Sequence, residues 1–97
     1  MAIGISSFDL TYHILDVRLS YNNLQKVSSG TFHALRNLKS IVLYGNSITT
    51  VESYAFKRLP RLNTLLLNDN SIERIETHAF SALSKLQKLE LQNNRLR

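Results

Sequence analysis

The hydrophobic positions of this chain follow a pattern that repeats every 24 residues. In the segment 62–85, LNTLLLNDNSIERIETHAFSALSK, Leu65 and Leu67 occupy alternate positions, and apolar residues then recur at wider spacing through Ile72 to Phe80. Alternation is typical of a short strand, whereas the wider spacing is typical of turns and a helical twist. Each unit is therefore predicted to contain a strand, a corner and a returning arm.

The same residue types return when the segment is moved by 24 residues in either direction. Aliphatic residues recur at the strand positions, asparagine recurs at the corner, and phenylalanine recurs in the arm wherever the unit is complete. Chance agreement of this length is negligible in a chain that is 43% hydrophobic, so we infer that the repeat determines the fold. We predict one solenoid domain with a partial unit at 1–13, complete units at 14–37, 38–61 and 62–85, and a partial unit at 86–97. Parallel strands are predicted at 16–19, 40–43, 64–67 and 88–91.

The spacing LxxLxxLxLxxNxLxxIxxxxFxxL resembles the leucine-rich repeat in its 24-residue form. This resemblance covers 14–97 and implies an α/β fold: a right-handed solenoid with a parallel β-sheet on the concave face and helical turns or loops on the convex side. We expect a helical turn in the arms at 30–37, 54–61 and 78–85. The runs YAFKRL and HAFSAL are similar to repeats in animal extracellular proteins of the Toll, Slit and neuronal receptor type. An extracellular or cell-surface parent, a receptor or adhesion protein, is therefore expected, with this chain as an internal piece that carries no signal peptide.

Two columns of residues have predicted structural roles. An asparagine side chain can donate and accept hydrogen bonds at once, so a column of corner asparagines should bond backbone groups of its own coil and of the adjacent coil. A phenylalanine in each arm should point inward and fill the core. The asparagine column is Asn22, Asn46, Asn70 and Asn94, and the phenylalanine column is Phe32, Phe56 and Phe80.

The outward side chains of the strands form the predicted binding surface, because the resemblance implies that a ligand binds the concave sheet. Val42, Tyr44 and Leu66 are apolar where solvent is expected, and charged residues surround them, as in an interface hot spot. Alternatively, single aliphatic residues belong in strands and carry no functional meaning. The residues predicted to contact a protein ligand are Arg18, Val42, Tyr44, Leu66, Asn68, Asp69, Lys88 and Glu90.

The net charge of +5 is unevenly distributed, because basic residues gather just before the strands. Such a ridge could attract a sulfated glycan or an acidic protein surface, although a simply solvated edge is the alternative. Nucleic acid is not expected, since no stacking aromatics interleave the basic residues, and no run is long enough to contact or span a membrane. The candidate glycan-binding residues are Arg36, Lys57, Arg58, Arg61 and Lys85.

Catalysis and metal binding are not expected. The chain has no cysteine, which excludes a disulfide, a thiolate metal site and a cysteine nucleophile. His13, His33 and His78 occupy three different repeat positions, so no column brings two of them together. We expect three surface histidines, no cofactor and no enzyme activity.

Three functional hypotheses remain open from the sequence. The first is a non-catalytic protein-recognition module, the second is a structural spacer within a longer solenoid, and the third is an intracellular scaffold. End-to-end self-association is also expected, because apolar residues near both ends lack a complete neighbouring coil. These residues are Ile3, Phe8 and Ile14 at one end and Leu86, Leu89, Leu91 and Leu96 at the other.

Overall fold

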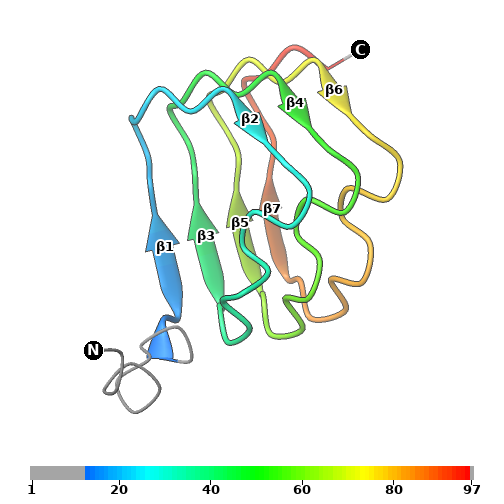
Figure 1. Cartoon of the computed structure of the whole chain (residues 1–97). Helices are drawn as coiled ribbons and strands as arrows, with labels where there is room; N and C mark the ends of the chain where they lie inside the picture. Colours follow the sequence, from blue (N-terminus) through cyan, green and yellow to red (C-terminus); the bar gives the residue numbers. More distant parts are fainter. Residues whose placement is uncertain (1–12, 97) are drawn as a thin grey trace, which may run out of the picture.

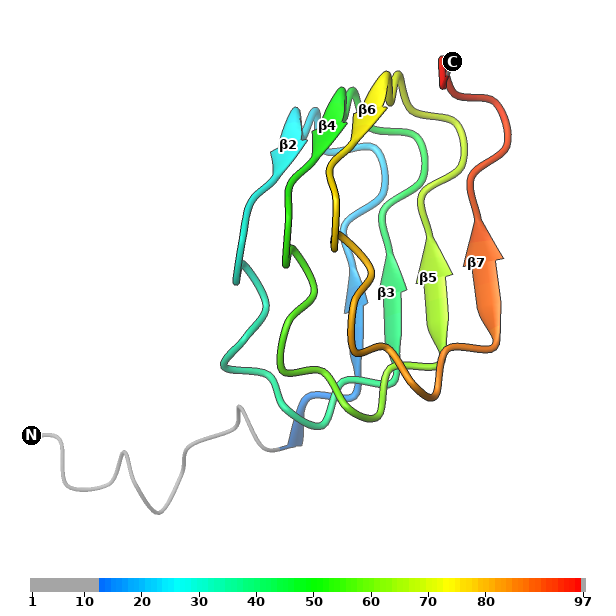
Figure 2. The ribbon, with the colours of Figure 1, turned by 90° about the vertical axis from the view of Figure 1, so that its right-hand side faces the viewer.

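The computed structural model describes residues 13–96, which wind into a stack of coils that each contain a strand, a corner and a returning arm (Figure 1). Two parallel sheets run through the stack, one in the order β1-β3-β5-β7 and the other in the order β2-β4-β6. Figure 2 shows the two sheets on opposite sides of the coils. The seven strands are β1 (Asp16–Arg18), β2 (Lys26–Val27), β3 (Ser40–Val42), β4 (Thr50–Val51), β5 (Thr64–Leu66), β6 (Arg74–Ile75) and β7 (Lys88–Glu90).

The four-stranded sheet has the register that the 24-residue repeat predicts. One row across its strands consists of Val17, Ile41, Leu65 and Leu89. Each strand is one residue shorter than expected, yet the next residue still bonds to the following coil, as where Leu43 N donates to Leu66 O at 2.8 Å. The prediction of parallel strands in this register is therefore confirmed.

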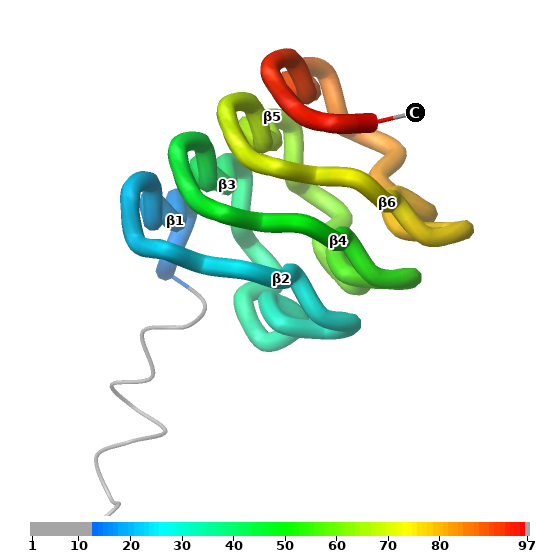
Figure 3. Tube along the Cα trace, turned by 90° about the horizontal axis from the view of Figure 1, so that it is seen from above, coloured from blue at the N-terminus to red at the C-terminus, as the bar shows by residue number. Residues whose placement is uncertain are grey.

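The three-stranded sheet was not predicted. Its strands contain only two residues each, and Val27 and Val51 point into the core while Lys26 faces solvent. A two-residue alternation cannot be distinguished from a turn by periodicity, which is why the sequence gave no signal. The coils nevertheless bond here as well, with Glu52 N donating to Val27 O at 3.0 Å. Viewed from above in Figure 3, successive coils nest along both sides.

The returning arms are turns, and the expectation of a helical turn in them is wrong. In the part of the chain that the structure describes, 30–37, 54–61 and 78–85 contain turns and no helix. Each arm begins with a residue of positive φ: Gly30 at 70°, Tyr54 at 57° and His78 at 66°. A left-handed residue breaks the run of right-handed dihedrals that a helix needs, so single turns follow, such as Leu35 N to Phe32 O at 2.9 Å.

The corner asparagines bond as predicted, and Asn46 shows the full pattern. Its Oδ1 accepts from Asn22 N at 2.7 Å and from Leu24 N at 3.1 Å, and its Nδ2 donates to Leu19 O and Leu43 O at 3.0 and 2.9 Å. Asn70 and Asn94 repeat three of these four bonds one and two coils further on, accepting from Ile48 N and Ile72 N and donating to two carbonyls each. Asn22 is exposed, and within residues 13–96 its side-chain Nδ2 donates to Ser20 O of its own coil, at 3.0 Å. Each later asparagine thus ties its coil to the preceding one.

The phenylalanines stack behind the asparagines, as predicted. The ring centroids of Phe32 and Phe56 lie 6.1 Å apart, and those of Phe56 and Phe80 lie 6.0 Å apart, with nearly parallel planes in both pairs. Phe32 and Phe56 are buried and Phe80 is half-buried against the same core. Burying these rings contributes about 2 kcal/mol each, so the stack stabilises the contact between neighbouring coils.

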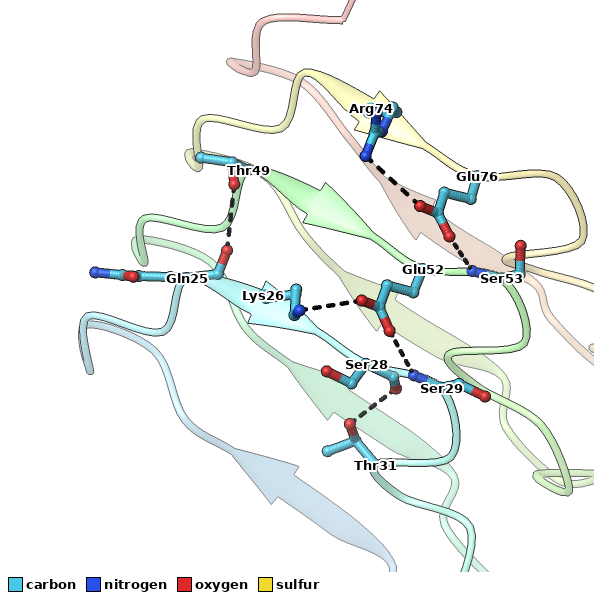
Figure 4. Close-up of polar contacts among 10 residues, drawn as sticks. All are labelled: Gln25, Lys26, Ser28, Ser29, Thr31, Thr49, Glu52, Ser53, Arg74 and Glu76. Atoms are coloured by element: carbon cyan, nitrogen blue, oxygen red, sulfur yellow. Dashed lines mark hydrogen bonds and ion pairs between the residues drawn. The ribbon is translucent and has the colours of Figure 1, made fainter.

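Carboxylates on the arm side add a second link between coils, which the sequence pattern did not reveal (Figure 4). Glu52 Oε1 accepts from Ser29 N of the preceding coil at 3.2 Å, and Glu52 Oε2 lies 3.2 Å from Lys26 Nζ. Glu76 repeats the first contact one coil later, accepting from Ser53 N at 3.0 Å. Each glutamate therefore accepts from a backbone N–H of the preceding coil, in addition to carrying charge.

The outermost described coils are less well covered than the central ones. Leu19 is 37% exposed, Leu89 is 39% exposed and Leu96 is 43% exposed, whereas Ile41 and Leu65 are fully buried. The expected contribution of Ile3 and Phe8 to the preceding coil lies outside the described residues. No helix within residues 13–96 is long and apolar enough to cross a membrane.

Candidate functional site

The solvent-facing side chains of β1, β3, β5 and β7, with the corners that follow them, form one continuous surface, which we call the sheet face. In β3 and β5 the middle residue is buried and its two neighbours are half-buried, so Val42 and Leu66 point away from the core. The strand register places Arg18, Val42, Leu66 and Glu90 in one row. The structure thus brings together the residues that the sequence predicted to be neighbours on this surface.

The apolar centre of the sheet face is partly covered. Val42, Tyr44 and Leu66 are each half-buried. Strands flank Val42 and Leu66 on both sides, and the ring of Tyr21 packs against Tyr44. They therefore present an apolar strip with little freedom to move, and ordering such side chains on binding costs little entropy.

Tyr21 extends this strip and is its most exposed member. Its ring lies edge-on to that of Tyr44, with centroids 5.6 Å apart and an interplanar angle of 85°, and Tyr21 is 76% exposed. A Cβ on Gly45 would lie 2.6 Å from Cδ1 of Tyr21 and closer still to Cε1, so the ring occupies space that only a glycine leaves. Sequence analysis did not place Tyr21 among the contact residues. The sequence feature that could have indicated this contact is the position of Tyr21, an aromatic residue 24 residues before Gly45.

Asp69 is held in place beside the strip by amide groups. Its Oδ2 accepts from Asn68 Nδ2 at 2.7 Å, and its Oδ1 accepts from Asn93 Nδ2 at 2.9 Å. Asn68 Oδ1 and Ser20 Oγ, in the coils on either side of Tyr44, are buried and have no partner within residues 13–96. These two oxygens leave hydrogen-bonding capacity unused next to the aromatic pair.

The charged residues at the ends of the row differ in how firmly they are held. Lys88 Nζ lies 4.0 Å from Glu90 Oε2, and Glu90 Oε1 accepts from Gln92 Nε2 at 3.2 Å. Arg18 is exposed and has no ion-pair partner in the described coils. Arg18 is therefore an exposed charge not held by an ion pair within residues 13–96, at the opposite end of the row from Glu90.

The structure divides the predicted basic ridge into separate parts. Arg36 and Arg58 line one hollow with Pro60, and Arg61 and Lys85 line a second hollow that also includes Pro60. Lys57 lies apart from both, against Gly30, where a Cβ would come 2.9 Å from Lys57 Cε. The ridge is therefore a pair of adjoining hollows around Pro60, with Lys57 outside them.

The three histidines are exposed, as predicted, and they do not converge. His33 Nδ1 lies 2.6 Å from Gly30 O, and His78 Nδ1 lies 3.2 Å from Ser81 Oγ. His78 also stacks on Tyr54 at 5.5 Å. Over residues 13–96 no three histidine or acidic side chains group closely enough to hold a metal ion.

The described chain is a repeat solenoid: its coils stack through two parallel sheets and an internal asparagine ladder. It offers a ligand a broad exposed strand surface and not a closed pocket. The family model described as leucine rich repeat matches residues 12–72 and again residues 36–96. These matches cover most of the chain, so the chain belongs to the leucine-rich repeat family. Domains of this family are generally protein-interaction modules and are typically non-catalytic. No curated protein matches the chain in sequence.

Proposed function

We propose that this chain is a non-catalytic protein-recognition module that binds a protein ligand on the sheet face. The observation that carries the proposal is the apolar strip formed by Tyr21, Tyr44, Val42 and Leu66. Val42 and Leu66 lie on the paired strands β3 and β5, and Tyr21 and Tyr44 lie in the corners after β1 and β3, where Tyr21 N donates to Tyr44 O. Interface hot spots are enriched in tyrosine and are surrounded by residues that exclude water. Affinity would come from this strip.

Charged residues around the strip supply orientation. Arg18 lies at one end of the row, Glu90 lies at the other, and Asp69 and Asn68 lie at the corner beside Tyr44. Opposite charges at the two ends of a row favour one alignment of a ligand with a complementary charge pattern and disfavour the reverse alignment.

We place this recognition outside the cell, in a receptor or adhesion protein that is secreted or anchored to a membrane. The support is the similarity of the YAFKRL and HAFSAL arms to repeats of animal extracellular proteins. An intracellular scaffold and a structural spacer are the alternatives, and the experiment below separates all three.

The test measures binding of the 97-residue chain to two panels, one of purified extracellular domains and one of cytosolic proteins. The test variant carries Val42→Ser, Tyr44→Ser and Leu66→Ser together. The control variant carries Tyr54→Ser and His78→Ser, which removes the stacked ring pair of the arms and leaves the sheet face unchanged. Circular dichroism and thermal unfolding establish that each variant is folded before binding is compared.

We expect extracellular ligands whose affinity falls about tenfold or more in the sheet-face variant and stays within about twofold in the control. Ligands found only among cytosolic proteins would overturn the extracellular assignment and favour the scaffold. Ligands that bind the sheet-face variant at unchanged strength, or an absence of ligands in both panels, would overturn the binding surface and favour the spacer.

A further inference from the structure

A second surface of the molecule, at the opposite ends of the strands from the corners, is formed by the loops that enter β3, β5 and β7, at the lower edge of the coils in Figure 2. It contains an open hollow of about 540 Å³ lined by Lys39, Pro60, Arg61, Asn63, Lys85 and Gln87. A second hollow of about 450 Å³ adjoins it across Pro60 and is lined by Arg36, Arg58, Leu59 and Ala82 as well. We call the two together the entry groove.

The backbone beneath the entry groove is fixed by bonds between coils. Lys39 O accepts from Asn63 N at 2.9 Å, and Asn63 O accepts from Gln87 N at 2.9 Å, so one residue of each coil is tied to its equivalent in the next. Arg61 and Lys85 also occupy equivalent positions in neighbouring coils and therefore rise from backbone segments about 5 Å apart. The groove is thus a preformed row of basic residues.

The cations of the entry groove are not neutralised by the described part of the protein. The ion pairs of residues 13–96 are Lys26 with Glu52, Arg74 with Glu76 and Lys88 with Glu90, and none of these residues lines the groove. The exposed cations of the groove are Arg36, Lys39, Arg58, Arg61 and Lys85. Five like charges around one proline repel each other, and an external anion would relieve that repulsion.

We propose that the entry groove binds a linear sulfated glycan. Its cations alternate with groups suited to sugar hydroxyls, since the Asn63 and Gln87 amides can both donate and accept hydrogen bonds. Asn63 Oδ1 already accepts from Thr64 Oγ1 at 2.9 Å, which leaves Asn63 Nδ2 for a ligand. Arginine in the row can hold a sulfate through two N–H groups at once, and lysine acts as a point charge beside it.

A glycan fits the groove better than a nucleic acid or an acidic protein does. No tyrosine or phenylalanine lines either hollow, so bases have no ring on which to stack. Protein interfaces have a buried aromatic or aliphatic centre, whereas Pro60 is the one apolar residue among those that line the hollow with Lys39, Arg61 and Lys85. The structure also changes one member of the cation set that charge alone suggested, because Lys39 lines the groove and Lys57 does not.

Calorimetry of the 97-residue chain with a heparin oligosaccharide of defined length tests the proposal, with the desulfated oligosaccharide and a single-stranded DNA of similar charge as competing probes. The test variant is Arg61→Gln with Lys85→Gln. The control variant is Lys57→Gln with Arg95→Gln, which removes the same charge from exposed positions outside the groove. A third variant, Arg61→Lys with Lys85→Arg, keeps the charge and checks that the fold tolerates changes at these positions.

We expect the sulfated oligosaccharide to bind, the desulfated one not to bind, and the DNA to bind more weakly. Affinity should fall about tenfold in the test variant and at most about twofold in the control, and it should be retained in the third variant. An equal loss in the test and control variants would show that binding depends on net charge alone and would overturn the site. DNA that binds as tightly as the sulfated oligosaccharide would overturn the ligand class. Because these variants leave the sheet face unchanged, either failure is independent of protein-ligand binding there.

Discussion

The ring of Tyr21 occupies the space beside the α-carbon of Gly45 in the next coil, at a point where both residues have positive φ, 61° for Tyr21 and 74° for Gly45. A bulky residue in this conformation costs about 1 kcal/mol. The edge-on contact with Tyr44 offsets part of that cost, since such aromatic pairs contribute about 0.5–1.5 kcal/mol. The most exposed member of the apolar strip is thus held beside a position where its neighbour has no side chain.

This relationship predicts coupling between the two positions. Gly45→Ala should lower the free energy of unfolding by about 2 kcal/mol, because alanine is strained at positive φ and its Cβ displaces the Tyr21 ring. In a Tyr21→Ser background the same change should cost only about 1 kcal/mol, since the displaced ring is absent. Urea unfolding of the four proteins of this cycle measures the coupling. Equal costs in both backgrounds would contradict the contact.

The asparagine ladder predicts a large difference between two chemically identical changes. Asn46→Asp should lower the free energy of unfolding by about 2 kcal/mol, because aspartate cannot donate to Leu19 O or Leu43 O. Leu19 O is then left unpaired in a part-buried corner, and Leu43 O keeps only its bond from Asn70 Nδ2. Asn22→Asp should change it by less than about 0.5 kcal/mol, because Asn22 is exposed. Chemical denaturation measures both, and equal effects would show that coil-to-coil bonding by the side chain is unimportant.

Glu52 predicts a pH dependence of stability. The hydrogen bond from Lys26, followed by that from Ser29 N–H, holds the pKa of Glu52 below its usual value of 4.5. As the pH falls, the unfolded chain therefore binds a proton at this site before the folded chain does. The contribution of Glu52 to the free energy of unfolding is fully present above the unfolded pKa and is lost as the pH falls through the folded pKa. Glu52→Gln should flatten the decline of the urea midpoint below pH 4.5. Glu73→Gln, a change in the following coil at a residue with no ion pair among those described, serves as the control and should leave the decline in place.

The exposed apolar residues of the last coil predict self-association. Leu89 lies on β7, which is an edge strand with unpaired backbone groups, and it is 39% exposed. We expect sedimentation velocity to show concentration-dependent dimers that Leu89→Lys abolishes. Tyr54→Lys, at a 48% exposed residue of a central coil, should leave them unchanged. A wild-type chain that remains monomeric at high concentration would contradict this prediction.

The sequence was sufficient to predict the coil architecture because its determinants recur. Leu65, Asn70 and Phe80 each have equivalents one repeat earlier, and the buried row, the ladder and the ring stack follow directly from that recurrence. The aliphatic residue at this strand position, Ile41 or Leu65, is fully buried in both central coils. The spacing of one repeat therefore predicts the packing of its neighbours as well.

Features that depend on a single pair of residues could not be predicted in the same way. The helical twist expected in the arms does not form, because Tyr54 and His78 adopt positive φ. The identity of these residues does not by itself predict that conformation. The placement of Tyr21 depends on the absence of a side chain at Gly45, and the exclusion of Lys57 from the entry groove depends on which way one arm turns. Repeat position alone specifies neither.

Amide hydrogen exchange, measured residue by residue by NMR, tests most directly whether each coil is held by the next. The amides of Ile48 and Ile72 donate to side chains of the following coil, Asn70 Oδ1 at 3.1 Å and Asn94 Oδ1 at 2.9 Å, and Leu43 N donates to Leu66 O. All three should exchange slowly, and Asn70→Ala should release Ile48 while leaving Ile72 protected. Exchange of these amides at the rate of an unstructured peptide in the wild-type chain would contradict the nested coils on which both proposed binding surfaces depend.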